Sequence, residues 1–361
     1  MIKTPVPHYQ SRVARIREAL QKKRLDGFLV TDMHNVRYLT GFTGSSGFAL
    51  ITKKDCILLT DFRYKEQSEK ETQGWDIVIE KGSRIDLFRD LCKKTGIKKL
   101  GFESSVSYEF YTQLLYKRVR LISGGRLIER IRETKDDVEI QSIKEAVRRA
   151  ETAFLDIRHH IRHGISERAI ALRLEERLKK NGCMQIPFAI IVASGPNSAM
   201  PHAKPTERKL QQGDLVIIDW GGEADGYFSD MTRTLLMRGT HIDRQKEIYN
   251  LVLKSNRESI SSVVPGAKTR DIDAAARNII KKAGYGELFG HGTGHGIGLQ
   301  VHEAPRLSWM KNDVVRMNMV FTIEPGIYVP GMGGVRIEDM VVVGEKKVHA
   351  LTSLPKKLEI I

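Results

Sequence analysis

Five residues in the C-terminal part of the chain have the types and spacing of a metal centre: Asp219, Asp230, His295, Glu324 and Glu338. The two Asp lie in LVIIDWGGEADGYFSDMTRT and the two Glu lie in VFTIEPGIYVPGMGGVRIEDMVVV. Each segment has the pattern of strand, glycine-containing turn and strand. Each carboxylate pair is therefore expected nearly opposite across its own hairpin, about 5 Å apart. Buried carboxylates that close repel each other unless a cation lies between them.

The composition of this set predicts a hydrolytic metal centre. Four carboxylates balance the charge of two divalent ions, and one imidazole completes an oxygen-rich dinuclear site. The alternative is that these are turn, capping or solvated residues, which is the commoner role of a hairpin Asp. However, Asp219 ends the apolar run LVIID, Glu324 follows VFTI and Glu338 follows GVRI. Carboxylates at the ends of runs that should be buried need a partner, so the pattern favours a metallohydrolase.

The composition of the chain limits the classes of protein to which it can belong. With 361 residues, 41% hydrophobic and 29% charged, it is expected to form two globular domains rather than a disordered chain. No apolar stretch approaches membrane-spanning length, and the N-terminal segment MIKTPVPHYQSRVARIREAL lacks the apolar core of a secretory leader. Cys56, Cys92 and Cys183 are odd in number and form no CxxC pair, which argues against disulfides and zinc–cysteine sites. A cytoplasmic location is expected.

The formal net charge of +15 raises the question of nucleic-acid binding. The basic residues lie in segments such as REALQKKR and RLEERLKK, where Glu is interleaved at helical spacing. That pattern is typical of a solvated helix face. Zinc-finger spacing and RNP-like aromatic motifs are absent from the sequence. No specific nucleic-acid binding is therefore expected, and the charge is interpreted as a surface property.

Residues 1–126 alternate between helical and extended patterns, which predicts a mixed α/β domain. A helix is expected over residues 8–25, followed by the strand FLVT, and the segments GFALIT and CILLTD are expected to form paired strands. Further helices are expected near residues 63–73, 84–94 and 107–117, with strands at DIVIE, KKLGFE and RVRLIS. The segment RLIERIRETKDDVE is expected to be a linker to the second domain.

Residues 127–361 contain one arrangement twice. Helices expected at about 135–163 and 166–180 precede the Asp hairpin, and helices expected at about 243–262 and 269–283 precede the Glu hairpin. A repeated helix–helix–hairpin unit predicts pseudo-twofold symmetry, with one carboxylate pair from each half. The metal site is then expected where the halves meet.

Several motifs resemble a known group of enzymes. HGTGHGIGLQVHE (291–303), EPGIY (324–328), VRIED (335–339) and the spacing of Asp219 and Asp230 resemble the pita-bread metallopeptidases, which include methionine aminopeptidase, aminopeptidase P and prolidase. NVRYLTGFTGSSG followed by LLTDFRY resembles the N-terminal domain of aminopeptidase P and prolidase, which methionine aminopeptidases lack. The resemblance covers essentially the whole chain. It implies an α/β fold class with an N-terminal creatinase-like mixed α/β domain and a C-terminal pita-bread (creatinase/aminopeptidase) domain.

The resemblance also implies roles for individual residues. The five residues named first are the metal ligands, and Glu324 doubles as the proton shuttle. His202 and His302 line the site and stabilise the oxyanion or the scissile nitrogen. His291 and Arg336 match the proline-specific branch, although a plain ion pair between Arg336 and a carboxylate is an equal alternative. Tyr328 and Tyr227 are expected to hydrogen-bond in the substrate pocket, and Thr232 to orient Asp230. The expected catalytic residues are thus Glu324, His202, His302 and His291, and the expected substrate-binding residues are His202, His291, His302, Arg336 and Tyr328.

The function expected from these features is that of an Xaa-Pro aminopeptidase acting on proline-containing peptides. The alternative within the family is an Xaa-Pro dipeptidase (prolidase). A creatinase-like hydrolase without metals is disfavoured because four carboxylates would then lack a cation, and a non-catalytic binding module is disfavoured because no ligand is missing. Two divalent ions per chain are expected, with Mn favoured over Co or Zn. The resemblance further implies a homodimer.

Overall fold

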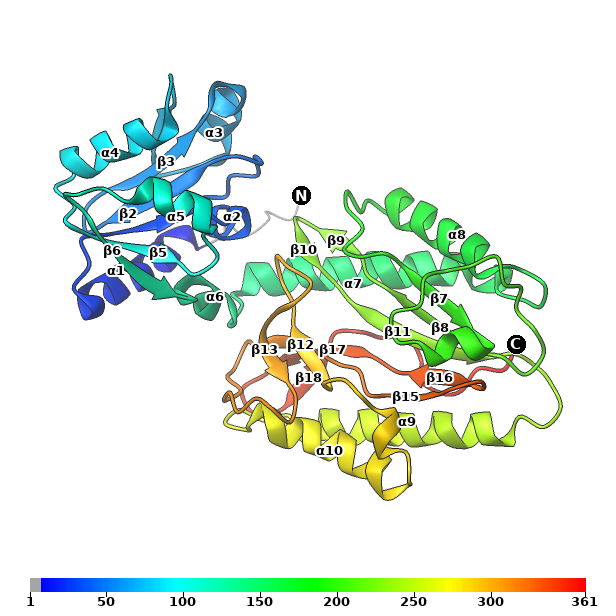
Figure 1. Ribbon diagram of the computed structural model, residues 1–361. Helices are drawn as coiled ribbons and strands as arrows, with labels where there is room; N and C mark the ends of the chain where they lie inside the picture. The colour runs from blue at the N-terminus through cyan, green and yellow to red at the C-terminus, as the bar shows by residue number, and fades with distance from the viewer. Residues whose placement is uncertain (1–7) are drawn as a thin grey trace. The chain divides into compact units, whose positions relative to one another are not determined.

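The structure is a computed structural model that describes residues 8–361 (Figure 1). The chain forms two compact units, the first ending at Arg132 and the second spanning Glu133–Ile361. Among the helices of residues 8–361, none combines the length and the apolar character needed to span a bilayer. Each unit is described separately below.

The first unit is built on a mixed six-stranded sheet in the order β4-β3-β2-β1-β5-β6. Its central strand β1 pairs antiparallel with β2 and parallel with β5, so the sheet joins a meander to a parallel segment. This sheet confirms the expected mixed α/β character. The strands are β1 (Gly27–Val30), β2 (Phe48–Thr52), β3 (Cys56–Thr60), β4 (Asp76–Ile79), β5 (Lys99–Glu103) and β6 (Arg120–Gly125).

The helices of the first unit include two that the sequence pattern did not reveal. The short helix α2 begins where the Asp32 side chain accepts hydrogen bonds from the backbone N–H groups of His34 and Asn35. Helix α6 lies in the segment expected to be a linker, and its Arg132 Nη1 donates to Asn35 Oδ1 at 2.6 Å. This buried bond ties α6 to α2, so the first unit extends beyond residue 126. The helices are α1 (Tyr9–Lys23), α2 (Met33–Thr40), α3 (Lys65–Glu71), α4 (Arg84–Lys94), α5 (Tyr108–Leu114) and α6 (Leu127–Arg132), with a 3-10 turn η1 (Phe62–Tyr64).

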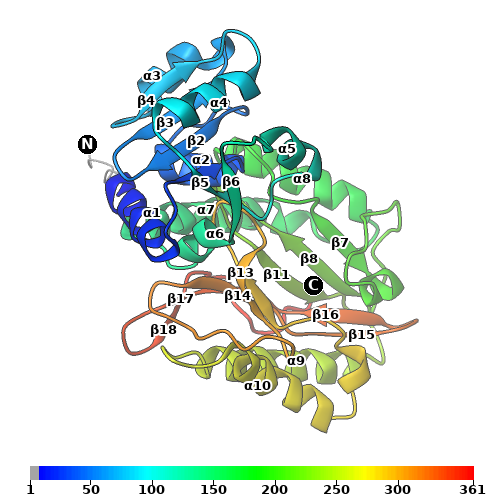
Figure 2. The ribbon, with the colours of Figure 1, turned by 60° about the vertical axis from the view of Figure 1, so that its left-hand side comes forward.

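The second unit contains two pairs of packed helices with strands between them. Figures 1 and 2 both show α7 (Asp137–Ile157) and α8 (Glu167–Lys180) on one side of the strands and α9 (Asp243–Ser261) and α10 (Thr269–Lys282) on the other. Helix α7 begins with a capping box between Asp136 and Glu139. The expected repetition of a helix pair followed by a hairpin is therefore present. Short 3-10 turns η2 (Arg158–His160), η3 (Gly195–Ala199) and η4 (Gly286–Leu288) lie in the connections.

The strands of the second unit form two main antiparallel sheets and two small hairpin ladders. One sheet has the order β11-β8-β7 and the other has the order β13-β12-β14-β17-β18, while β9 pairs with β10 and β15 with β16. Their strands are β7 (Ile191–Ser194), β8 (Leu215–Trp220), β9 (Glu223–Ala224), β10 (Tyr227–Phe228), β11 (Met231–Leu236), β12 (Gly294–Gly296), β13 (Glu303–Leu307), β14 (Val320–Ile323), β15 (Gly326–Val329), β16 (Gly333–Arg336), β17 (Asp339–Val343) and β18 (Val348–Ala350).

The strand register confirms the expected position of one carboxylate pair and corrects the other. In the second hairpin Ile323 pairs with Asp339 and Gly326 with Arg336, a continuous register that sets Glu324 opposite Glu338 as expected. In the first hairpin, Asp219 pairs with Thr232. Asp230, expected nearly opposite Asp219, is therefore offset from that position by two residues, because the two-residue turn lies at Asp225 and Gly226, with φ of 51° and 76°.

Candidate metal centre

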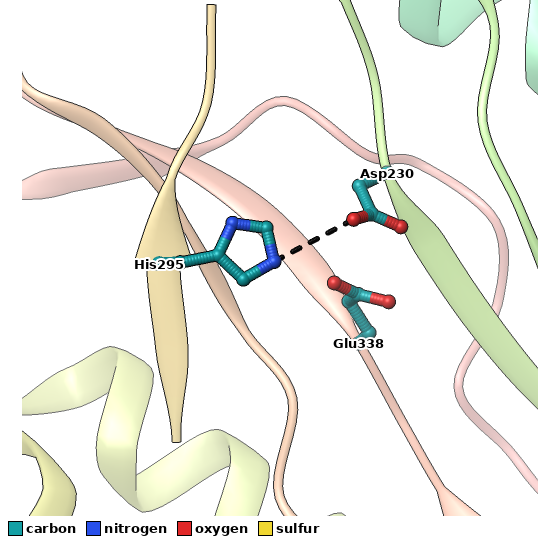
Figure 3. A group of neighbouring side chains, drawn as sticks. All are labelled: Asp230, His295 and Glu338. Atoms are coloured by element: carbon teal, nitrogen blue, oxygen red, sulfur yellow. Dashed lines mark ion pairs between the residues drawn. The ribbon is translucent and has the colours of Figure 1, made fainter. Parts of the chain in front are cut away.

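Three of the five expected ligands converge in the second unit. Asp230, His295 and Glu338 each offer a ligand atom, and these atoms lie within 4.8 Å of one another. Figure 3 shows the three side chains pointing toward a common point from three different strand segments. Asp230 immediately precedes β11, His295 lies in β12, and Glu338 lies between β16 and β17. Such a cluster of buried carboxylates and an imidazole has the donor set of a divalent metal site.

The other two expected ligands border this cluster. Glu324 Oε1 lies 3.5 Å from His295 Nε2, close to the 3.6 Å that separates the same nitrogen from Asp230 Oδ2. Asp219 Oδ2 accepts a hydrogen bond from Arg336 Nη2 at 2.6 Å, which occupies one side of that carboxylate. The structure thus gathers all five expected residues into one region, although Asp219 also forms an ion pair.

Two buried carboxylate oxygens in this region lack a hydrogen-bond donor. Asp219 Oδ1 and Glu338 Oε1 are both inaccessible to solvent and accept no hydrogen bond from any residue that the structure describes. Leaving such an oxygen unsatisfied costs about 1–3 kcal/mol or more. Divalent cations bind carboxylate oxygens, so these two atoms fit a bound metal ion.

The ionisation of the cluster is strongly perturbed. Burial raises the pKa of Asp230 well above its usual value, and the negative charges of Glu338 and Asp219 raise it further. Burial likewise raises the pKa of Glu338, with Glu324 as the largest additional cause. Several buried carboxylates therefore cannot all be ionised without a compensating charge. A divalent cation reverses this balance, because it favours the ionised form of every carboxylate around it.

His295 is held in the form that a ligand requires. Its Nδ1 lies 3.1 Å from the carbonyl oxygen of Gly296, which fixes the proton on Nδ1 and leaves Nε2 unprotonated toward the carboxylates. Burial lowers the pKa of His295, which keeps the ring neutral. A Cβ atom on Gly294 would collide with the carbonyl of Thr322, and one on Gly296 with the carbonyl of Ala304. The glycines around His295 therefore allow β12 to lie between its neighbours.

Thr232 orients a different ligand from the one expected. Its hydroxyl donates to Glu338 Oε2 at 2.8 Å and accepts from Arg336 Nε at 3.1 Å. Its backbone carbonyl accepts from the N–H of Glu338 at 3.1 Å. The expectation that Thr232 orients Asp230 is therefore wrong, because the register of β8 and β11 sets Thr232 opposite Asp219 and beside the second hairpin.

A chain of hydrogen bonds joins the expected substrate residues to Asp219. Arg336 Nη1 donates to the phenol oxygen of Tyr328 at 2.9 Å, and the same oxygen lies 2.9 Å from His291 Nε2. Because a guanidinium can only donate, the phenol proton points to His291 Nε2. His291 Nδ1 lies 2.8 Å from the carbonyl of Gly292, which fixes its proton there, and burial lowers the pKa of the ring. His291 therefore accepts from Tyr328 as a neutral imidazole.

Arg336 is occupied almost entirely by the protein. The Nε–H donates to Thr232, the two N–H groups of Nη1 donate to Tyr328 and to the carbonyl of Pro201, and one N–H of Nη2 donates to Asp219. Four of its five N–H groups are thus used, and the residue is 3% exposed. This geometry favours the ion-pair alternative for Arg336 over direct contact with a substrate.

The other two expected site histidines, His302 and His202, are both exposed. The His302 ring centroid is 4.4 Å from that of His295, in an edge-to-face arrangement, and burial lowers the pKa of His302 to about 4. His202 is exposed, in the connection between β7 and β8. Sequence reasoning missed Asp273 and Arg277 on α10, which hold the backbone before β12. Their signal was the i, i+4 acid–base spacing in the segment DAAAR.

Comparison with known families agrees with this geometry. Residues 141–345 match the model of metallopeptidase family M24, and residues 12–134 match the creatinase/prolidase N-terminal domain. The chain belongs to metallopeptidase family M24. Membership of the M24 family implies an enzyme that uses divalent metal ions. It also confirms the expected fold, a creatinase-like N-terminal domain followed by a pita-bread catalytic domain.

The chain is similar to other proteins over nearly its whole length. The structure of an Xaa-Pro dipeptidase from Bacillus anthracis is 41% identical, with a TM-score of 0.95 over 98% of this chain and 100% of that one. The Xaa-Pro dipeptidase of Pyrococcus horikoshii is 37% identical over 351 residues, covering 96% of this chain and 98% of the relative. An X-Pro aminopeptidase structure from Thermotoga maritima is 34% identical, with a TM-score of 0.89 over 97% and 99% of the two chains.

Proposed function

We propose that this M24 metallopeptidase is an Xaa-Pro dipeptidase (prolidase) that uses two divalent metal ions. The preference for dipeptides departs from the aminopeptidase expected from the sequence, and it is supported by similarity to the Xaa-Pro dipeptidases of Bacillus anthracis and Pyrococcus horikoshii. The observation that carries proline specificity is the hydrogen-bonded chain of His291, Tyr328 and Arg336 beside the carboxylate cluster.

The metal ligands in this proposal are Asp219, Asp230, His295, Glu324 and Glu338. Their fit to divalent ions rests on the convergence of three of them and on the two buried oxygens that lack a donor. Divalent ions in such a site act as Lewis acids on the scissile carbonyl. The protein contributes the fixed geometry, since Thr232 orients Glu338 and the Gly296 carbonyl orients His295.

Glu324 is the residue that we assign to proton transfer. Its side chain is 18% exposed, compared with 7% for Asp230, so solvent and substrate reach Glu324 more easily than Asp230. The Thr322 hydroxyl lies 3.4 Å from Oε1 and helps to orient it. A carboxylate in this position can accept a proton from the attacking water and pass it to the leaving nitrogen.

His302 and His202 are assigned to the stabilisation of developing charge. With a pKa of about 4, His302 is neutral at pH 7 and has one N–H to donate. Such a donor beside the site is worth about a hundredfold or more in rate when it meets a developing oxyanion. His291 and Tyr328 are assigned to contact with the proline ring, whose tertiary amide nitrogen carries no N–H and must be recognised by shape.

Substrate length is tested by direct comparison. The metal-loaded enzyme should hydrolyse Ala-Pro efficiently, Ala-Pro-Pro at least tenfold more slowly, and Met-Ala hardly at all. Metal analysis of the purified enzyme should give about two transition ions per chain. Faster cleavage of Ala-Pro-Pro would restore the aminopeptidase assignment, and preference for Met-Ala would exclude proline specificity.

Three further features belong to the same proposal. We propose Mn as the native metal, because an oxygen-rich donor set accepts it readily, with Co or Zn as alternatives. We propose the cytoplasm as location, which the free thiols of Cys56, Cys92 and Cys183 support. We propose a homodimer on the family resemblance, and light scattering of the purified enzyme tests it.

A further inference from the structure

A pair of residues on α10 grips the chain segment that leads into the metal-binding strand. Arg277 and Asp273 lie one turn apart and form a bidentate ion pair, with Nε–Oδ2 and Nη2–Oδ1 distances both of 2.8 Å. Asp273 is 1% exposed and Arg277 is 19% exposed. A paired fork of this kind is geometrically specific and holds both side chains in one orientation.

The guanidinium of Arg277 holds two backbone carbonyls of this segment. Its Nη1 donates to the carbonyl of Phe289 at 2.8 Å, and its Nη2 donates to the carbonyl of His291 at 2.7 Å. The guanidinium carbon also lies 4.2 Å from the ring centroid of Phe289 and 4.3 Å from that of Trp309. Hydrogen bonds and cation–π contacts thus fix Arg277 and the backbone on either side of Gly290.

Asp273 holds the same segment two residues further along the chain, at Thr293. Its Oδ1 accepts from the Thr293 hydroxyl at 2.8 Å and from the Thr293 N–H at 3.2 Å. The carbonyl of Thr293 in turn accepts from the N–H of Glu324 at 2.7 Å. The ion pair therefore reaches His291 through Arg277 and the backbone of Glu324 through Asp273.

We propose that Arg277 is a positioning residue for the M24 reaction, which fixes His291 and, through it, the phenol of Tyr328. Among residues 8–361, the acceptor for the phenol proton is His291 Nε2, and the phenol oxygen accepts from Arg336. A shift of the His291 backbone therefore breaks the bond that orients the Tyr328 hydroxyl. That hydroxyl accepts a hydrogen bond from Arg336, and Arg336 in turn donates to Asp219. This inference rests on the proposed function, because its kinetic consequence is slower cleavage of Xaa-Pro substrates.

A double-mutant cycle tests whether Arg277 acts through His291. On Ala-Pro with the metal-loaded enzyme, Arg277→Ala should lower kcat/KM about tenfold or more, the scale of a displaced binding group. His291→Ala should lower it about a hundredfold. If the two residues act in series, the double variant should match His291→Ala within about threefold. Additive losses, giving about a thousandfold, would overturn the proposal.

Arg149 provides a matched control. It lies on α7, pairs with Glu145 one turn earlier at 3.0 Å, and donates to the carbonyls of Gly182 and Glu223. Arg149→Ala therefore removes the same kind of contacts but none to the backbone of residues 289–293. It should lower Tm by a similar amount but leave kcat/KM within about twofold. An equal loss of activity in Arg149→Ala and Arg277→Ala would show that Arg277 is merely structural.

Two measurements do not depend on turnover. Metal content should stay at the wild-type level in Arg277→Ala, because no expected ligand is removed. A crystal structure of Arg277→Ala should show the His291 carbonyl displaced and the His291–Tyr328 contact of 2.9 Å broken. An unchanged His291–Tyr328 contact in Arg277→Ala would overturn the inference. Failure of the wild-type enzyme to cleave Ala-Pro would refute the proposed function but not the inference.

Discussion

Asp219 divides its two oxygens between different kinds of partner. Oδ2 forms an ion pair with Arg336 at 2.6 Å, whereas the buried Oδ1 has no donor among residues 8–361. A carboxylate held on one side by a guanidinium presents its other oxygen in a fixed direction. The same logic applies to Glu338, whose Oε2 accepts from Thr232 while Oε1 has no such partner among the described residues. Single unpaired oxygens, rather than whole carboxylates, are therefore the candidate coordinating atoms.

Removal of Asp230 tests the metal assignment. Asp230→Ala should remove at least one metal ion and nearly all activity. The Tm of the metal-free protein should not fall, because the substitution removes a buried carboxylate that is repelled by its neighbours. Metal content by mass spectrometry and Tm of the metal-free protein are the measurements. Asp243→Ala, whose side chain is 93% exposed on α9, is the control and should change neither. Two ions and normal turnover in Asp230→Ala would exclude it as a ligand.

Cys92 gives a prediction for alkaline pH. Burial in the core of the first unit raises the pKa of its thiol to about 12, above the ordinary value of 9.0. Above pH 9 the unfolded chain loses this proton before the folded one does, so the free energy of unfolding should fall as pH rises from 9 to 12. Urea unfolding of wild type and Cys92→Ala at pH 8 and pH 10.5 measures the difference. Between pH 8 and pH 10.5 the free energy of unfolding should fall more in the wild type than in Cys92→Ala. Equal decreases in the two proteins would contradict the buried-thiol explanation.

At the scale of elements, two hairpins and the strand β12 position the site residues. The hairpin of β15 and β16 places Tyr328 opposite Gly334 and ends at Arg336, two residues before Glu338. The turn of this hairpin contains Gly331 with φ of 78°. Residues with a Cβ atom disfavour that conformation, so the turn requires glycine at this position. The turn also sets the strand register that places Glu324 opposite Glu338.

Gly331→Ala tests this turn. No atom lies within 4 Å of the position of the added Cβ, so the cost is conformational and amounts to about 1 kcal/mol. Gly82→Ala is the control, since its Cβ would also meet open space but its φ is not positive. That variant should be neutral or slightly stabilising, because alanine restricts the unfolded chain. Thermal unfolding checks the pair, and a Tm of Gly331→Ala at or above that of Gly82→Ala would refute the argument.

At the scale of the whole molecule, folding of the second unit brings together charges that oppose it. The carboxylate cluster contains groups from both hairpins, so each half of the unit contributes negative charge to the same buried region. Burial of like charges is unfavourable without a counter-ion. Bound metal is therefore expected to stabilise the fold as well as to supply the chemistry.

Metal removal should lower Tm of the second unit. An ion at about a thousand times its Kd stabilises the folded state by about 4 kcal/mol, which is roughly 10 °C for a unit of this size. Trp220, which stacks on Phe154 in this unit, is a suitable fluorescence probe. Chelator should lower the transition in wild type and change it much less in Asp230→Ala. An identical shift in both proteins would show that the stabilising ion binds elsewhere.

The sequence alone determined the elements and the types of residue at the site. Local periodicity predicted the four long helices of the second unit, and glycine turns between apolar runs predicted both hairpins, because these signals depend only on neighbours in the chain. Short elements such as α2 and α6 escaped, since one or two turns of helix carry little periodicity. Motif resemblance extended the prediction to a pita-bread metallopeptidase, which the match to family M24 confirms.

Only the tertiary structure decided which atoms meet. Asp219 pairs with Thr232, two residues beyond Asp230, because the turn lies at Asp225 and Gly226, and this register could not be read from spacing alone. The occupation of Arg336 by four protein partners, and the grip of Arg277 on the His291 backbone, depend on contacts between segments far apart in the chain. Local sequence sets which conformations a segment favours, whereas side-chain partners are selected by the packing of distant segments.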